Sequence, residues 1–244
     1  MPAVDRQLVV FDFDWSMADQ DTDRWVFEVN APNIRRWMED TERSGSMQFT
    51  DMVAKALREA HAQGVTRQQL EDALRITPFH PAMVRGITDL KAAGKTTFFC
   101  LSNANAVYIS VILKEKGLTA MFDEIVTNPA EWDPSGLLVV RRRVDPSGPQ
   151  HSCQVGCSAN MCKGATGEEL EAFYKRHQPA YDRVIYVGDG SNDFCPALRL
   201  RTQDILLCRS FGGLHKRIAR EGGLKCTVKY WTGAWEVEEI FKAL

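Results

Sequence analysis

Residues 8–16 read LVVFDFDWS, and this stretch decides the fold of the 244-residue chain. An apolar run leads into two acids, Asp12 and Asp14, which are two positions apart. A short apolar run bounded by polar residues is typical of a strand buried on both faces. Side chains at i and i+2 of an extended chain point to the same side. We therefore expect both carboxylates to face one site at the end of a buried strand.

Four further apolar runs repeat this pattern along the chain. They cover residues 95–101, 124–127, 183–187 and 204–208. Helical patterns lie between them, over residues 81–93, 105–116 and 166–177. Strands that alternate with helices predict an α/β fold with a doubly wound, mainly parallel, Rossmann-like sheet.

The long stretch between the first and second predicted strands carries only helical patterns. They lie near residues 22–39, 50–63 and 66–75. A crossover between parallel strands needs only one helix. The sequence therefore predicts a helical cap over residues 19–79, inserted into a core domain of residues 1–18 and 80–244. We expect the cap to lie beside the carboxyl ends of the strands, where ligands bind in such folds.

Residues 128–144 differ in character from the rest of the chain. The turn sequence DPSG, at residues 133–136, precedes the run LLVVRRRV. A strong turn followed by β-branched residues predicts a β-hairpin. Its arginines, residues 141–143, could reach a second phosphate group, although charged hairpin edges are usually solvated.

Composition and charge limit the partners that we expect. The formal net charge of −2 at pH 7 gives no electrostatic reason to expect binding to nucleic acid or to an anionic membrane. No apolar run approaches the ~20 residues that span a bilayer. The charged start, MPAVDR, is unlike a secretory signal. We expect a cytoplasmic protein with a small-molecule partner, and its oligomeric state stays open.

Three more polar motifs accompany the acid pair. Ser102 and Asn103 follow the second predicted strand, the motif GDGSND follows the run at 183–187, and Lys163 lies between them. An acid pair alone is usually a solvated strand end, but this ordered set suits phosphoryl transfer to a carboxylate. Mg²⁺ is held by carboxylates, water and phosphate. A lysine and a hydroxyl can hold the remaining phosphate oxygens, and glycines permit close backbone approach.

These motifs resemble those of the haloacid dehalogenase superfamily of phosphatases. The closer similarity is to the branch that includes phosphoethanolamine/phosphocholine phosphatase and pyridoxal phosphate phosphatase-related proteins. It extends from about residue 9 to residue 196 and is carried by DFDWS, DTDRWV, SNAN, TNPAEWD, CSANMCKG and GDGSNDFCP. The resemblance implies a Mg²⁺-dependent phosphatase that hydrolyses a small phosphomonoester through an aspartyl-phosphate.

The resemblance also implies roles for three catalytic residues. Asp12 is the expected nucleophile and a magnesium ligand. Asp14 is the expected general acid and then general base, and its backbone carbonyl is expected to reach the metal. Lys163 is expected to bridge Asp12 and the phosphate.

Four other positions match the superfamily motifs. Ser102 and the backbone amide of Asn103 are expected to hold phosphate oxygens. Asp189 is expected to bind magnesium, and Asp193 to support the metal's water shell. Nearer relatives often have aspartate at the position of Asn103, which would change substrate preference if this side chain touches the substrate.

The cap sequence suggests how a substrate could be recognised. Acids lie beside aromatic residues at Asp19, Asp21, Asp23, Trp25 and Trp37. Such a group would suit a cationic head group, which favours phosphocholine or phosphoethanolamine and makes Asp23 a candidate substrate-binding residue. The alternative is that both tryptophans are core residues of an amphipathic helix. Pyridoxal phosphate, thiamine phosphate and inorganic pyrophosphate remain alternative substrates.

Seven cysteines occur in the chain. His151, Cys153, Cys157 and Cys162 are close in sequence and could hold a structural zinc ion, although their spacing is not a standard one. Buried or reactive thiols are the alternative that the non-standard spacing favours. The isolated cysteines, at 100, 195, 208 and 226, are expected to be small core residues.

Two other classes of protein remain open. A catalytically inactive relative that binds or regulates would be expected to lack one of the acids or the lysine. A receiver-like phosphoacceptor domain shares an aspartate and a lysine, but it would lack the helical insertion and the second acid of the Asp12–Asp14 pair. The complete set of motifs therefore favours an enzyme.

Overall fold

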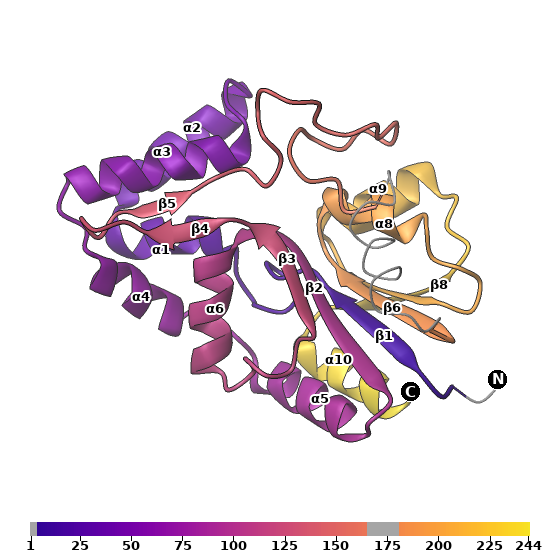
Figure 1. The fold of residues 1–244 in the computed structure, drawn as a ribbon. Coiled ribbons are helices and arrows are strands. Elements are labelled where there is room, and N and C mark those ends of the chain that lie inside the picture. Colours follow the sequence, from indigo (N-terminus) through magenta and orange to yellow (C-terminus); the bar gives the residue numbers. More distant parts are fainter. Residues whose placement is uncertain (1–3, 165–180) are drawn as a thin grey trace.

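The computed structural model describes residues 4–164 and 181–244 (Figure 1). Its centre is a six-stranded sheet in the order β3-β2-β1-β6-β7-β8. The strands are β1 (Gln7–Phe11), β2 (Thr96–Asn105), β3 (Glu124–Asn128), β6 (Arg183–Gly188), β7 (Ile205–Arg209) and β8 (Thr227–Trp231). All neighbouring pairs in this sheet are parallel. The predicted parallel, Rossmann-like α/β sheet is confirmed.

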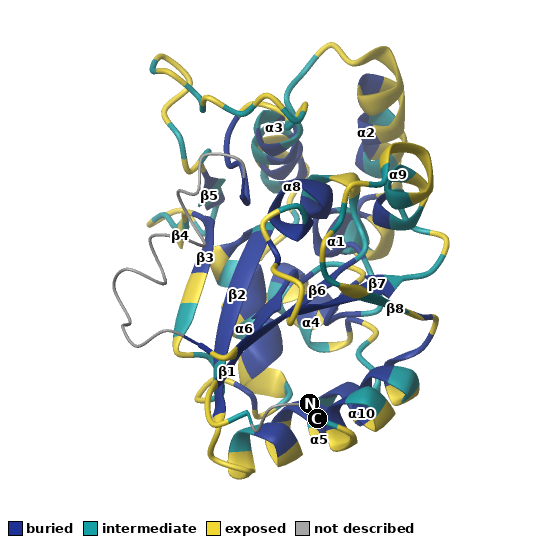
Figure 2. Ribbon diagram, turned by 90° about the vertical axis from the view of Figure 1, so that its right-hand side faces the viewer, coloured by how far each residue is buried: buried dark blue, intermediate teal, exposed yellow. Residues whose placement is uncertain are grey.

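Alternate residues of β1 enter two different hydrophobic cores. Val9 and Phe11 belong to one buried cluster, and Leu8 and Val10 to the other. The first cluster includes residues of α5 (Pro81–Ala92), α6 (Ala106–Glu115) and α10 (Ala234–Lys242), whereas the second includes residues of α8 (Phe194–Ala197) and α9 (Gly213–Glu221). Burying each such side chain contributes about 1.5–3 kcal/mol. The sheet is therefore covered on both faces, as the buried strands in Figure 2 show.

Five described helices separate β1 from β2, and the first four of them form a group apart from the sheet (Figure 1). They are α1 (Thr22–Asn30), α2 (Pro32–Ser44), α3 (Phe49–Ala62) and α4 (Arg67–Arg75). The helical pattern near residues 22–39 corresponds to two helices, because α1 ends before Ala31 and Pro32 begins α2. Proline suits the first turn of a helix, where its missing N–H has no partner to lose. The proposed cap boundaries at residues 19 and 79 stay a prediction.

The predicted hairpin at residues 128–144 is present. Strands β4 (Ala130–Trp132) and β5 (Leu138–Val140) pair antiparallel, and β5 lies against α3. The side chain of Asp133 accepts hydrogen bonds from the backbone N–H groups of Ser135 and Leu137, which fixes the turn. The helix predicted at 166–177 lies outside the described residues. Among the helices that are described, none has the length and apolar character required to cross a membrane.

Candidate active site

The carboxyl ends of β1, β2 and β6 meet at one edge of the sheet. Phe11 is in register with Cys100 on β2 and Val187 on β6, so the residues that follow lie side by side. The backbone N–H of Asp12 donates to the carbonyl of Val187 at 2.9 Å. Asp12, Ser102 and Asp189 line a cavity of about 500 Å³ at this edge. Ligands bind to parallel sheets at such a point, outside the carboxyl ends of the strands where the strand order reverses.

Lys163 lies next to this cavity, between two buried carboxylates, and is not itself among the described residues that line it. Its Nζ is 2.7 Å from Asp12 Oδ1 and 2.8 Å from Asp193 Oδ1. All three side chains are almost completely buried. Burial opposes the charge of Lys163, but Asp12 and Asp193 outweigh it and raise the lysine pKa above its usual value. The ammonium group is therefore held protonated against Asp12.

Asp193 fixes the loop that follows β6. Its Oδ1 also accepts a hydrogen bond from the Tyr186 hydroxyl at 2.8 Å, and its Oδ2 accepts from the backbone N–H groups of Asp189 and Gly190. Both oxygens of Asp193 are thus hydrogen-bonded within the protein. Its geometry suits a residue that positions Lys163 and the Asp189 loop.

The acids of the site form a donor set suited to a divalent cation. Carboxylate oxygens of Asp12, Asp189 and Asp193 lie within 4.8 Å of one another. Burial and then the charge of Asp193 raise the pKa of Asp12 to about 7, and burial and then Asp12 raise the pKa of Asp189 to about 8. One lysine does not balance three carboxylates. A small cluster of oxygen donors with excess negative charge fits Mg²⁺.

Asp14 faces the same cavity but has different partners. Its Oδ1 accepts hydrogen bonds from the Thr22 backbone N–H at 3.1 Å and the Thr22 hydroxyl at 2.8 Å. Burial, followed by the charges of Asp21 and Asp23, raises the Asp14 pKa well above its usual value. Asp12 and Asp14 therefore share a cavity, as predicted, while a proton is favoured on Asp14.

The two predicted phosphate-binding residues also line the cavity. The hydroxyl of Ser102 accepts a hydrogen bond from the backbone N–H of Ala104 at 3.1 Å. The side-chain oxygen of Asn103 accepts from Asn192 Nδ2 at 3.0 Å, and its backbone carbonyl accepts from Asn128 Nδ2 at 2.6 Å. These contacts hold the end of β2 against the loop after β6.

The helical group contributes an acidic wall to the cavity. Asp21, Asp23 and Glu42 line it, and Arg24 pairs with Asp21 and Glu42. Asp23 is buried and accepts a hydrogen bond from Asn105 Nδ2 at 3.4 Å. Burial and then Asp21 raise the pKa of Asp23 to about 8. This wall carries more acidic than basic groups.

The aromatic residues of the cavity are not the predicted ones. Among the residues that the structure describes, neither Trp25 nor Trp37 lines the cavity. Trp25 donates from Nε1 to the Ala73 carbonyl at 2.8 Å, and Trp37 packs against the helical core. The core alternative is therefore correct for Trp37, whereas Trp25 is half-buried, held by this hydrogen bond, and outside the hydrophobic cores of the described residues. Their place in the cavity is taken by Trp15 and Phe49.

Other charged residues singled out in the sequence are paired elsewhere. Asp19 pairs with Arg209 at 2.9 Å, and Arg141 pairs with Glu131 at 2.8 Å. Arg142 pairs with Asp51. Within the described part of the chain, none of these six residues lines the acidic cavity.

Sequence reasoning missed two arginines that line the cavity, Arg24 and Arg217. Arg217 is on α9 and donates to the carbonyl of Ser191 at 3.0 Å and to Glu221 at 2.9 Å. Charged residues on amphipathic helices are usually solvated. Arg24 lies in the DTDRWV motif, but no role in the site was predicted for it, and no local pattern marked Arg217 as part of a site.

Solved structures share this fold. A phosphoserine phosphatase with bound substrate matches with a TM-score of 0.60 and 15% identity over 98% of each chain. A haloacid dehalogenase family hydrolase from Salmonella enterica matches with a TM-score of 0.62 and 13% identity, over 89% of this chain and 71% of that one. The fold is therefore that of the haloacid dehalogenase hydrolases.

The family follows from the sequence itself. The chain belongs to the family described as "Putative Phosphatase", whose model matches residues 7–244. The prediction of a phosphoric monoester hydrolase of the haloacid dehalogenase superfamily is thereby confirmed.

Curated relatives confirm the predicted branch but differ in their named substrates. Probable phosphatase phospho1 of Danio rerio is 32% identical over 98% of this chain and 86% of its own length. Inorganic pyrophosphatase 2 of Arabidopsis thaliana is 31% identical over 96% and 81%, respectively. Pyridoxal phosphate phosphatase PHOSPHO2 of Mus musculus is 28% identical over 94% and 95%.

Proposed function

We propose that this phosphatase is Mg²⁺-dependent and hydrolyses a small phosphomonoester through an aspartyl-phosphate on Asp12. The observation that carries the proposal is the buried contact of Lys163 with Asp12 and Asp193, beside the cavity that Asp12 and Asp189 line. A nucleophilic carboxylate must stay ionised while it approaches a phosphate dianion. Lys163 supplies one positive charge for this purpose.

The reaction proceeds in two displacements. A carboxylate oxygen of Asp12 attacks phosphorus, the ester P–O bond breaks, and Asp14 gives its proton to the leaving alkoxide. Asp14 then takes a proton from water, which attacks phosphorus and releases inorganic phosphate from Asp12. The raised pKa of Asp14 supports its role as the acid in the first step.

The remaining residues of the site bind the metal and the phosphate group. Asp12, Asp189 and the backbone carbonyl of Asp14 would hold Mg²⁺, and Asp193 would support its water ligands. The ion supplies charge neutralisation for the transferred phosphoryl group. Ser102 and the backbone amide of Asn103 would hold phosphate oxygens.

Residues 19–79 would act as a cap over the core site. Asp23 of α1 and Phe49 of α3 line the same cavity as Asp12 and Asp189 of the core. A cap that closes over a substrate excludes water and reads the part of the substrate beyond the phosphate. Substrate choice would therefore depend on the helical group.

The acidic wall favours an ester that carries a positive charge, of the phosphocholine or phosphoethanolamine type, with Asp23 as a substrate-binding residue. Trp15 and Phe49 add aromatic surface, although the guanidinium groups of Arg209 and Arg24 already lie over these two rings. The name of the Mus musculus relative makes pyridoxal phosphate a further candidate monoester.

Inorganic pyrophosphate is a second candidate function. The name of the Arabidopsis thaliana relative suggests it, and Arg217 provides a cation on the cavity wall for a second phosphate group. Thiamine phosphate is a third candidate, because another Arabidopsis thaliana relative is named a thiamine phosphate phosphatase-like protein.

The proposal is tested by phosphate release from a panel of candidate substrates, with Mg²⁺ present or chelated. The panel contains phosphocholine, phosphoethanolamine, pyridoxal phosphate, thiamine phosphate, pyrophosphate and a sugar phosphate. We expect Mg²⁺-dependent turnover with a preference for amine-bearing esters, and no turnover by Asp12→Asn. Folded protein that releases no phosphate from any of them would instead support an inactive, regulatory relative.

A further inference from the structure

Four cysteine side chains converge next to Lys163. Cys153, Cys157 and Cys162 belong to the loop that precedes Lys163, and Cys195 belongs to α8. Their four sulfur atoms all lie within 4.8 Å of one another. The separation is 3.6 Å between Cys157 and Cys162, 3.7 Å between Cys162 and Cys195, and 3.9 Å between Cys153 and Cys195.

These distances match four ligands around one tetrahedral ion. A Zn–S bond of about 2.3 Å places the sulfurs of a tetrahedral site about 3.8 Å apart. A disulfide would require about 2.05 Å. We propose that Cys153, Cys157, Cys162 and Cys195 bind a structural zinc ion, at a site separate from the acidic cluster at Asp12.

The conformation of the loop supports this arrangement. Gly156 has a φ of 85°, a left-handed conformation that glycine adopts without strain, and it turns the chain between Cys153 and Cys157. The backbone N–H of Val155 points at Cys153 Sγ, 3.3 Å away. A backbone donor aimed at sulfur stabilises a thiolate, the form that binds metal. The carbonyl of Val155 is held by Arg217.

The ligand set differs from the one that the sequence suggested. The His151 ring is not part of the cluster, and its Nε2 lies 2.8 Å from the carbonyl oxygen of Ser158. Cys195, expected to be an isolated core thiol, is the fourth member instead. Four thiolates form a closed site of the structural type, with no position left for a substrate.

The proposed ion would position the catalytic groups. Cys162 directly precedes Lys163, and Cys195 lies two residues after Asp193. A metal held by both cysteines joins the loop that carries Lys163 to the segment that carries Asp193. The contact of 2.8 Å between Lys163 Nζ and Asp193 Oδ1 bridges the same two segments. The zinc site would therefore act on catalysis by holding Lys163 in place and by fixing Cys157, which lines the cavity.

The first test uses the wild-type protein, purified without chelators, with zinc supplied in the growth medium. We expect elemental analysis to find about one zinc per chain, and X-ray absorption at the zinc edge to find four sulfur ligands at about 2.3 Å. Zinc-free protein, or zinc coordinated by oxygen, would overturn the proposal. Formation of a disulfide bond between these cysteines would overturn it as well. Mass spectrometry would detect such a bond as an intact mass lower than that of the reduced chain by the hydrogens lost.

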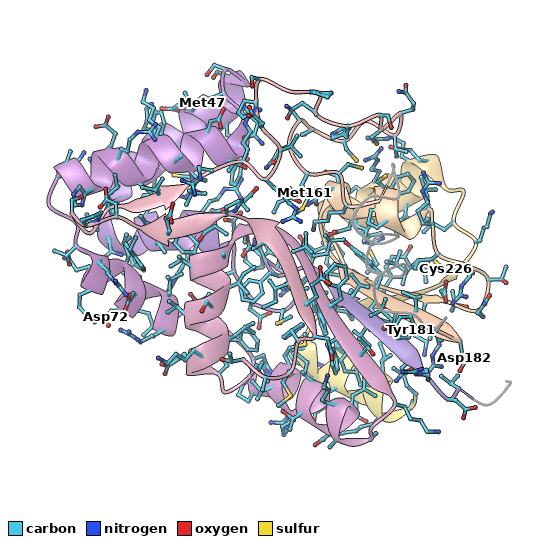
Figure 3. The ribbon with its side chains drawn as sticks, viewed as in Figure 1. Met47, Asp72, Met161, Tyr181, Asp182 and Cys226 are labelled. Carbon is cyan, nitrogen blue, oxygen red and sulfur yellow. The ribbon has the colours of Figure 1, made fainter. Side chains whose placement is uncertain are left out.

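Matched variants separate this site from the catalytic metal. Cys157→Ser and Cys195→Ser are expected to lower the zinc content at least tenfold, and to lower the melting temperature (Tm). Cys226→Ser is the control, because Cys226 lies near β8 and well away from Met161, the neighbour of Cys162 (Figure 3). Asp189→Asn should also keep its zinc. Zinc that is lost in Asp189→Asn but kept in both cysteine variants would place the ion in the acidic cluster and overturn the proposal.

Discussion

Lys163 Nζ lies 2.7 Å from Asp12 Oδ1 in a site where the lysine side chain is 0% exposed and the aspartate side chain 7%. Removing one partner from a buried ion pair leaves the other charge uncompensated, which is strongly destabilising. The second carboxylate on this lysine, from Asp193, increases that effect. This pair therefore links catalysis to the stability of the core.

Replacing the buried lysine is expected to affect both properties. We predict that Lys163→Met lowers kcat by about 10²–10³-fold, because a positive charge on the transferred phosphoryl group is lost. Tm without Mg²⁺ should also fall. Steady-state kinetics and thermal unfolding check these outcomes, with Lys114→Met, at an exposed helical position, as the control. Near-normal kcat in folded Lys163→Met would contradict the assigned role.

Asp14→Asn separates the two displacements of the mechanism. With an alkyl ester, we expect kcat to fall by about 10²–10⁴-fold, because the alkoxide cannot leave without a proton. With 4-nitrophenyl phosphate, whose leaving group needs no proton, we expect a rapid burst of about one nitrophenolate per chain, followed by slow turnover. Stopped-flow absorbance measures the burst. If Asp14→Asn kept the wild-type kcat with both substrates, a general acid at Asp14 would be contradicted.

Asp23→Asn is expected to stabilise the protein more at high pH than at low pH. The folded-state pKa of Asp23 is about 8, above the ordinary value of 3.8. The carboxylate therefore lowers the stability of the fold progressively as pH rises from about 4 to 8. Without Mg²⁺, we expect the variant's gain in unfolding free energy at pH 8.5 to exceed that at pH 5.5 by about 1–3 kcal/mol.

Asp133→Asn is the control for this pH dependence. The Ser135 hydroxyl is the main group that lowers the pKa of Asp133, so the ionised acid stabilises the hairpin turn at every pH well above 3.8. Removing it should destabilise the protein equally at pH 5.5 and 8.5. Denaturant unfolding at both pH values measures the two variants. If Asp23→Asn raised the unfolding free energy by the same amount at both pH values, the burial argument would be contradicted.

Gly164 allows the Lys163 loop to pack directly on α8. A methyl group on Gly164 would lie 2.5 Å from Pro196 Cα, a distance that requires the backbone to move. We predict that Gly164→Ala destabilises the fold by about 1–3 kcal/mol and lowers kcat by displacing Lys163. At Gly148, the nearest atom to an added methyl would be 3.6 Å away, so Gly148→Ala should stay within about 0.5 kcal/mol of wild type. Denaturant unfolding and steady-state kinetics measure both variants. Equal effects of the two substitutions on stability and kcat would contradict the packing argument.

Burial on both faces made the inner strands predictable. β1 and β6 are continuous apolar runs because helices cover both sides of the sheet at its centre. The strand β8 was missed because it lies at the sheet edge, where Lys229 and Tyr230 reach solvent and interrupt the apolar run. Edge strands carry a weaker hydrophobic signal than central ones.

The order of motifs predicted much of the site for a simple reason. Parallel strands end at the same edge of a sheet, so residues directly after β1, β2 and β6 meet there. This rule brought Asp12 and Asp189 together with Ser102, which the sequence placed just after a strand although β2 continues to Asn105. It does not say which face of a helix turns toward the cavity, which is why Trp25 was considered in place of Phe49.

Contacts between distant segments could not be predicted in the same way. Cys195 joins Cys162 across 33 residues of sequence, and Arg217 reaches the cavity from α9. Neither contact is marked by a periodic pattern or a local spacing. Tertiary packing alone determines them.

The central claim is a covalent phosphoryl group on Asp12, and mass spectrometry of acid-quenched protein tests it most directly. Wild-type protein is mixed with Mg²⁺ and excess substrate, quenched during turnover, and analysed intact and after proteolysis. We predict a population heavier by one phosphoryl group, carried by the peptide that contains Asp12 and absent in Asp12→Asn. Steady turnover with no phosphorylated aspartate, together with substantial activity in Asp12→Asn, would contradict it.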